Sequence, residues 1–131
     1  MSKHYKSLNS KIRDFIERQK IFFTASAAKS SRVNVSPRST DCLRIVDDST
    51  LIYLDQTGSG NETAAHIMGD GNVTIMMCAV EGPPQILRLY GRGRVIHRDS
   101  TEYADLLATW FANEAPVGAR QIIQLNVDAV Q

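Results

Sequence analysis

The 131-residue sequence lacks the long apolar run that marks a membrane protein. Its longest uninterrupted apolar stretch, residues 75–80, is far shorter than the roughly 20 residues that cross a bilayer as a helix. Residues 1–15 carry charges where a secretory signal peptide needs an apolar segment. We therefore expect a soluble, cytoplasmic protein without a membrane partner.

Cysteine and net charge are also scarce. The two cysteines, Cys42 and Cys78, have no metal-ligand spacing, so we expect buried reduced thiols, with a disulfide as the alternative. The formal charge of +1 excludes a general attraction for nucleic acid, so any anion site must be a local cluster of donors. His4, His66 and His97 are far apart in the sequence, and we expect no metal site and a packed His66.

What is present fits one ordinary domain across residues 1–131. A chain of this length buries roughly two-thirds of its unfolded surface. Hydrophobic residues make up 43% and charged residues 22%, as in soluble globular proteins. No repeat, linker or low-complexity segment interrupts the chain.

Apolar spacing predicts three helices, at residues 7–19, 61–68 and 100–113. Asn9 and Ser10 are suitable caps for the first. The last presents an apolar stripe that we expect to lie mainly in the core, with an aromatic over a flat cofactor ring as the alternative. The stripe is Tyr103, Leu106, Leu107, Trp110 and Phe111.

The remaining apolar segments predict strands and a mostly β fold. Asp47 and Asp48 are expected to form a turn, Pro37 to end the second strand, and residues 73–80 to be buried on both faces. Without βαβ alternation, the order favours an antiparallel β-barrel with flanking helices. The expected strands are 21–27, 33–36, 43–46, 51–55, 73–80, 86–97 and 120–127.

Alternation along residues 86–97 places Arg88, Arg92 and Arg94 on one strand face. Three guanidinium groups in a row suit a bound anion or a subunit interface. A solvated outer face is the competing interpretation, and the sequence leaves the choice open.

The segment TGSGNETAAHI, residues 57–67, is rich in glycine and hydroxyl residues before a helix. It lacks the lysine of a Walker loop and the third glycine of a dinucleotide fingerprint. Ser59 and Glu62 instead match a capping box. A capped helix start still presents free N–H groups that suit a phosphate, so both interpretations hold together.

Four stretches resemble the pyridoxamine 5′-phosphate oxidase-related family, whose members are FMN-binding split barrels. They are IFFTASAA, RVNVSPR, LIYLDQTGSGNETAAHI and VTIMMCAVEGPPQILRLYGRGRVI. The resemblance covers roughly residues 5–127. It implies a split-barrel fold and a homodimer with FMN at the subunit interface.

By resemblance, one set of residues is implied to bind FMN: Asn34, Ser36, Arg38, Tyr53, Asp55, Ser59, Gly60, Asn61 and Thr63. Asn34 and Ser36 would lie along the isoalloxazine ring, and Arg38 would meet the phosphate. Many members carry a basic residue where this chain has Asn61, and members of the subgroup usually continue past the last strand into a Cys-Gly-containing tail.

The implied function is that of a flavin-dependent oxidoreductase of unknown substrate. No residue stands out as acid, base or nucleophile, so no catalytic residue is named. The alternatives are a non-catalytic carrier or sensor that binds flavin or heme, and a split barrel that only dimerises. Pyridoxamine 5′-phosphate oxidase activity itself is not expected, because the substrate-phosphate residues near the family's C-terminus have no counterpart here.

Overall fold

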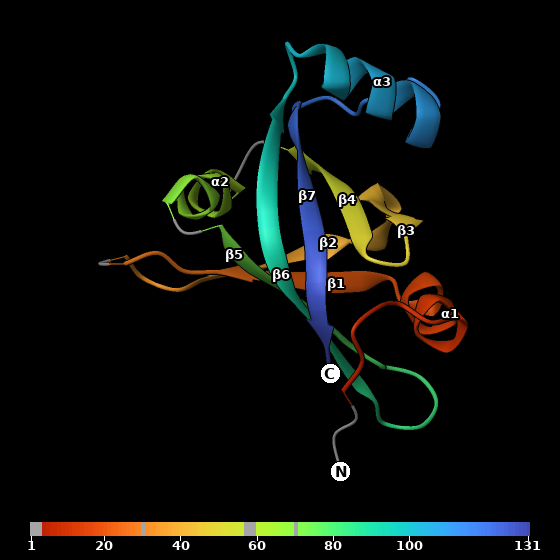
Figure 1. The fold of residues 1–131 in the computed structure, drawn as a ribbon. Helices are drawn as coiled ribbons and strands as arrows, with labels where there is room; N and C mark the ends of the chain where they lie inside the picture. The colour runs from red at the N-terminus through yellow and green to blue at the C-terminus, as the bar shows by residue number, and fades with distance from the viewer. Residues whose placement is uncertain (1–3, 30, 57–59, 70) are drawn as a thin grey trace.

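The computed structural model describes residues 4–29, 31–56, 60–69 and 71–131. Seven antiparallel strands form one curved sheet in the order β2-β1-β5-β6-β7-β4-β3 (Figure 1). The elements along the chain are α1 (Ser10–Arg18), β1 (Ile21–Ser26), β2 (Asn34–Ser39), the 3₁₀ turn η1 (Thr40–Cys42), β3 (Leu43–Asp47), β4 (Thr50–Gln56), α2 (Gly60–Gly69), β5 (Asn72–Cys78), β6 (Ile86–His97), α3 (Thr101–Trp110) and β7 (Ala119–Val130). The predicted antiparallel β architecture with flanking helices is confirmed.

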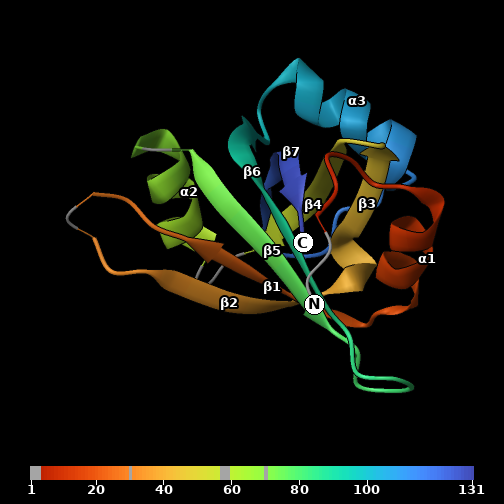
Figure 2. The ribbon, with the colours of Figure 1, turned by 60° about the horizontal axis from the view of Figure 1, so that its bottom comes forward.

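The sheet has a core on each face, because strand side chains alternate. Leu51 and Tyr53 of β4 enter the main core inside the curved sheet. Ile52 and Leu54 face the other way and pack beneath α3. Figure 2 shows α2 at one end of β1, β2 and β5, and α1 at the opposite end.

The predicted cap Asn9 is found at the start of α1, and the predicted apolar stripe packs along α3. Asn9 accepts a hydrogen bond from the Ile12 amide and starts α1 at Ser10, three residues later than predicted. Helix α3 ends at Trp110 rather than residue 113. The next residues turn into the left-handed region, with φ 53° at Ala112, while Arg44 donates to the Trp110 carbonyl at 2.9 Å. No described helix is long and apolar enough to span a bilayer.

Pro37 does not end the second strand, so that prediction is wrong. Strand β2 continues to Ser39, and Pro37 pairs in register with Phe23 of β1. β2 is an edge strand of the sheet. A residue without an N–H group is tolerated there, because an edge strand has a ladder partner on one side only.

Strand β5 is buried on one face only, against the prediction for residues 73–80. Val73, Ile75 and Met77 are buried, whereas Thr74, Met76 and Cys78 are half-buried. An antiparallel sheet can leave one face toward solvent, which an apolar run alone does not reveal.

The two cysteines are free thiols, and both are half-buried rather than buried. Burial raises the pKa of the Cys42 thiol to about 11, so it stays protonated at neutral pH.

The turn predicted at 47–50 is present: Asp47 accepts a hydrogen bond from the Ser49 amide at 2.9 Å.

Gly91 allows β6 and β7 to approach closely at a register shift between Tyr90 and Gly91. A Cβ at Gly91 would overlap the carbonyl oxygen of Asn126 and lie 2.8 Å from its carbonyl carbon. Backbone cannot move aside as a flexible side chain can, so only glycine fits.

We predict that Gly91→Ala lowers the free energy of unfolding by about 3 kcal/mol, because it forces two central strands apart. Gly82→Ala is the control: its site is open but has φ +77°, so we expect a loss of about 1 kcal/mol. Urea unfolding followed by circular dichroism measures both. Equal losses would contradict the close approach.

Candidate functional site

The buried polar residues of the described chain form one group rather than scattered exceptions. They come from β1, β2, the end of β4, α2 and the start of β7, and we call them, with four neighbouring residues, the polar seam. Its buried members are Thr24, Ser26, Ser36, Asp55, Thr63, His66 and Gln121, and its contacting members are Asn34, Arg38 and Arg120, with Tyr53 included through its ring contact with Arg38. Because unpaired polar groups are costly to bury, a set of this kind indicates a built site.

Strand alternation aligns the seam residues of β2. Asn34, Ser36 and Arg38 are two residues apart and so share a face. Across the ladder they oppose Ser26, Thr24 and Phe22 of β1. The seam therefore runs along the inner face of two neighbouring strands.

Helix α2 closes one end of the seam through two side-chain contacts. The Asn34 amide donates to Thr63 Oγ1 at 3.1 Å, and Ser26 Oγ lies 2.9 Å from His66 Nδ1. Thr63 is 1% exposed and His66 is 5% exposed. The expected packed role of His66 is confirmed, and its contact fixes α2 against β1.

Asp55 closes the other end and is fully buried. Its Oδ2 accepts from Gln121 Nε2 at 2.6 Å, and Arg120 Nη2 and Nε lie 3.4 Å away. Its Oδ1 lies 2.9 Å from Arg38 Nη1 but lacks hydrogen-bond geometry with any described group. The short distance between opposite charges makes this contact an ion pair in which Coulomb attraction outweighs direction.

Arg38 is the least satisfied group in the seam. Its guanidinium lies over the Tyr53 ring, 5.0 Å from the centroid, and its side chain is 12% exposed. Nε and Nη2 are buried without a hydrogen-bond partner among the described residues. Two guanidinium cations, Arg38 and Arg120, surround the single carboxylate of Asp55. The described seam is therefore short of negative charge and rich in donors.

Tyr53 adds a neutral phenol beside Arg38. Burial raises the pKa of Tyr53, so the hydroxyl keeps its proton. The Tyr53 hydroxyl and Thr24 Oγ1 are buried and, among the described residues, have no partner within hydrogen-bond geometry. Both can donate to or accept from a polyhydroxyl ligand.

The structure brings six of the implied residues into the seam: Asn34, Ser36, Arg38, Tyr53, Asp55 and Thr63. Gly60 and Asn61 open α2, and Ser59 lies outside the described residues. The arginine face of β6 is separate from the seam: Arg94 forms an exposed ion pair with Glu102 at 2.6 Å.

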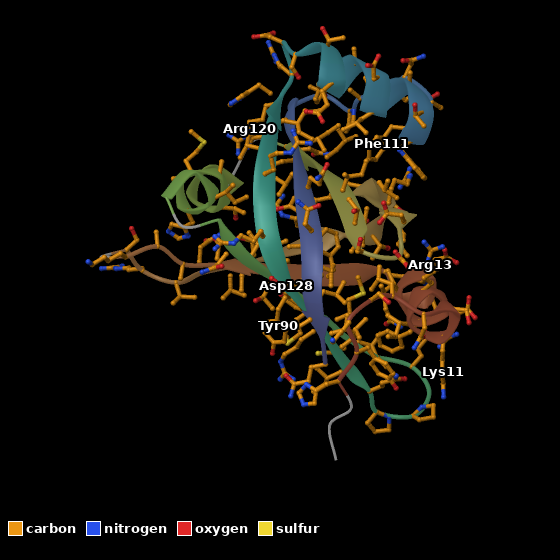
Figure 3. All side chains as sticks on the ribbon, viewed as in Figure 1. Lys11, Arg13, Tyr90, Phe111, Arg120 and Asp128 are labelled. Atoms are coloured by element: carbon orange, nitrogen blue, oxygen red, sulfur yellow. The ribbon has the colours of Figure 1, made fainter. Side chains whose placement is uncertain are left out.

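Sequence reasoning missed Thr24, Ser26, Arg120 and Gln121. The first two had a signal, because they alternate on one face of a strand otherwise built from apolar residues. Arg120 and Gln121 gave none, since the start of β7 reaches Asp55 only through the pairing of β7 with β4. Figure 3 labels Arg120 at this end of β7.

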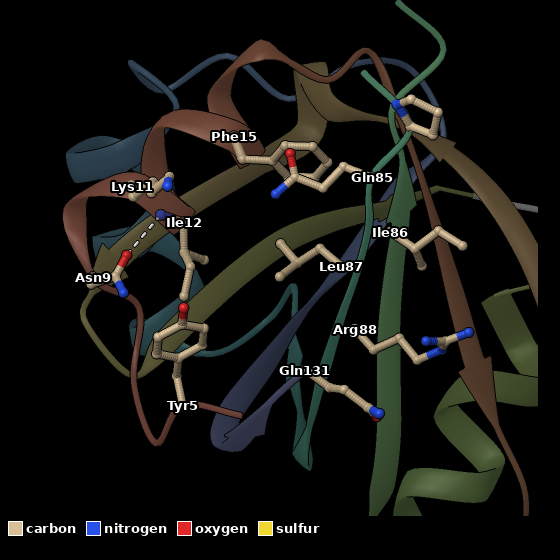
Figure 4. A pocket seen from close by; sticks show the side chains of 11 residues that line it. Tyr5, Asn9, Lys11, Ile12, Phe15, Gln85, Ile86, Leu87, Arg88 and Gln131 are labelled. Atoms are coloured by element: carbon tan, nitrogen blue, oxygen red, sulfur yellow. Dashed lines mark hydrogen bonds between the residues drawn. The ribbon is translucent and has the colours of Figure 1, made fainter. Parts of the chain in front are cut away.

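A separate hollow lies at the start of α1. It has a volume of about 640 Å³. Leu87 and Phe15 form its apolar floor, with Lys11 and Arg88 at the sides (Figure 4). No described group of His, Cys, Asp or Glu is arranged to hold a metal ion, either here or in the seam.

The chain belongs to the pyridoxamine 5′-phosphate oxidase family, whose model matches residues 8–131. A relative from Aspergillus flavus, the pyridoxamine 5′-phosphate oxidase family protein ustO, is 36% identical over 97% of this chain. The chain spans about half of that relative's length, 52%. The resemblance to this family drawn from the sequence is confirmed.

Solved structures confirm the split-barrel fold. A putative pyridoxamine 5′-phosphate oxidase from Lactobacillus delbrueckii matches with a TM-score of 0.73 and 18% identity, over 97% of this chain and 99% of that one. An FMN-binding protein from Syntrophomonas wolfei matches with a TM-score of 0.61 and 17% identity, over 91% and 81%.

Proteins with this fold bind different cofactors. The heme storage protein HutZ from Vibrio cholerae matches with a TM-score of 0.67 and 15% identity, over 95% of this chain and 93% of that one. An F420 reductase is also among the similar structures. At these identities the likeness establishes the fold and leaves the cofactor open.

We predict that Ser26→Ala lowers the free energy of unfolding by about 1–2 kcal/mol, because it leaves Nδ1 of the buried His66 without its partner. Ser10→Ala is the matched control, since Ser10 is exposed on the first turn of α1. Chemical denaturation of both variants measures the difference. A loss no larger than that of the control would mean that the Ser26 contact does not hold α2.

Proposed function

We propose that residues 1–131 form an FMN-binding split-barrel domain of a cytoplasmic flavoprotein, a flavin-dependent oxidoreductase of unknown substrate. The observation that supports this most is the buried edge of Arg38 without a partner among the described residues. A planar guanidinium edge matches the oxygens of a phosphate monoester. Membership of the family and the fold shared with an FMN-binding protein agree with it.

The residues present fit the polar parts of FMN. Arg38 would bind the phosphate, together with donors at the start of α2, where the helix dipole favours an anion. The Tyr53 hydroxyl suits the ribityl chain, and Asn34 and Ser36 would lie along the ring system. In this proposal Gly60 and Asn61, at the start of α2, and Ser59, which lies outside the described residues, also contribute.

Bound FMN would supply the hydride or electron transfer. The protein's own residues bind and orient it, and the buried seam excludes water from the phosphate end. We assign no catalytic residue to this chain. Phosphate binding is therefore tested by flavin titration, and redox activity by reduction of the bound flavin.

Heme is the alternative cofactor, because HutZ shares the fold. The described residues support it less well. His4 and His97 are exposed, and the buried His66 already uses Nδ1 in its contact with Ser26. A Soret band in the purified protein would favour heme, whereas flavin absorbance would favour FMN.

A homodimer through the outer face of β2, β1, β5 and β6 belongs to the same proposal. Register aligns two rows of largely apolar residues on this face: Val35, Ala25, Thr74 and Tyr90, then Pro37, Phe23, Met76 and Arg88. Val35 is 60% exposed, and Phe23, Ala25 and Met76 are half-buried. A second copy would bury the apolar run that the sequence predicted to be covered on both sides.

We predict that Arg38→Met weakens FMN binding by roughly ten- to a hundredfold, because it removes a charge-assisted partner of the phosphate. Riboflavin, which lacks the phosphate, should lose little. Quenching of flavin fluorescence on titration with each protein measures both affinities.

The two flavins together give this experiment its control. Equal losses for FMN and riboflavin would mean that Arg38 contacts the shared part of the flavin or only supports the fold. A wild-type protein that binds neither flavin would refute the proposed function. If the wild-type protein binds FMN, reduction of the bound flavin by NADH or NADPH would separate an enzyme from a carrier.

We predict that Val35→Arg converts a dimer to a monomer, since it places a charge in the proposed interface. Val117→Arg is the matched control, because Val117 is fully exposed in the loop before β7. Light scattering coupled to size exclusion measures the mass. A monomeric wild-type chain, or equal behaviour of the two variants, would contradict the interface.

A further inference from the structure

Asp55 is placed in the implied flavin-binding set, yet its contacts are with protein. Both carboxylate oxygens meet neighbouring side chains: Arg38 at 2.9 Å, Gln121 at 2.6 Å and Arg120 at 3.4 Å. The side chain is 0% exposed. An ionised carboxylate accepts hydrogen bonds and donates none, and it repels a phosphate. Asp55 is therefore poorly suited to touch the phosphate itself.

Arg38 is held at one edge and on one face. Nη1 meets Asp55, and the guanidinium plane lies over the Tyr53 ring at 5.0 Å. The opposite edge, Nε and Nη2, is buried and has no partner within the described part of the chain. In a guanidinium, Nε and Nη2 form a two-donor fork that matches two oxygens of one oxyanion.

We propose that Asp55 is a positioning residue that sets the preference of this site for phosphorylated flavin. Fixed by Gln121 and Arg120, it orients Arg38 so that the fork meets a phosphate monoester. The inference rests on the proposed FMN binding, and it gives Asp55 and the start of β7 a role distinct from flavin contact. Asp55 then influences the preference for FMN over riboflavin only through its effect on Arg38.

Asp55→Asn should change FMN affinity in opposite directions depending on whether Asp55 acts through its charge or by orienting Arg38. Removing the carboxylate makes the seam more positive, so charge alone would strengthen the binding of a phosphate. A loss of orientation weakens it, because a fork gains its strength from alignment. The sign of the change therefore distinguishes the two effects.

The test measures FMN and riboflavin affinity for wild type, Asp55→Asn, Arg38→Met and the double variant. We expect Asp55→Asn to weaken FMN binding about tenfold, the effect of losing an aligned charged contact, and riboflavin by less than about twofold. In the Arg38→Met background this loss should disappear, and Asp55→Asn should leave FMN binding unchanged or stronger, because the carboxylate favours the phosphate only through Arg38 and otherwise repels it. Asp47→Asn, in the exposed turn, should leave both affinities unchanged.

Gln121→Met is a second variant that keeps every charge. It removes the 2.6 Å donor to Asp55, and we expect the same FMN-specific loss on a smaller scale. This variant decides the question if Asp55→Asn does not fold, which thermal melting by circular dichroism will report.

Three outcomes overturn the inference. They are equal losses for both flavins, unchanged or stronger FMN binding in Asp55→Asn with Arg38 present, and a loss of FMN affinity on Asp55→Asn that persists without Arg38. If Gln121→Met has to decide, unchanged FMN binding overturns it as well. A wild-type chain that binds neither flavin refutes the proposed function and this inference with it, whereas FMN binding that ignores Asp55 refutes the inference alone.

Discussion

The contact between Asp55 and Arg38 is the interaction on which the polar seam depends. A fully buried carboxylate is tolerable only when paired and hydrogen-bonded, and here three residues from β2 and β7 supply that pairing. The same contact joins the edge strand β2 to the end of β4. One ion pair therefore both links two strands of the sheet and orders the candidate site.

The two faces of the sheet are covered to different extents along its strands. β4 and β7 are buried by the main core on one side and by α3 on the other. β1, β2 and β5 carry the seam and the main core on the inner side, whereas their outer side is half-buried on β1 and β5 and exposed on β2. Two strands of the candidate cofactor site, β1 and β2, therefore differ from β4 and β7, because their outer side is not covered by a second core among the described residues.

Most of the fold followed from local pattern. Apolar spacing located all three helices, and Asn9 was a suitable cap for the first, because the free amides at a helix start need a side-chain acceptor. The misjudged features, Pro37 and the one-sided burial of β5, depend on which strand lies at an edge and what covers each face. Neither is a local property.

For the site, the sequence by itself determined which strand faces carry polar groups, since alternation forces Asn34, Ser36 and Arg38 to one side. It also contained the stretches that resemble the family, and that resemblance implied six of the seam residues. Only the tertiary structure decided that Arg120 and Gln121 reach Asp55, because 65 and 66 residues separate them and register across β4 and β7 joins them. It likewise decided that one edge of Arg38 has no partner among the described residues, a property of the packing around the residue and not of the residue alone.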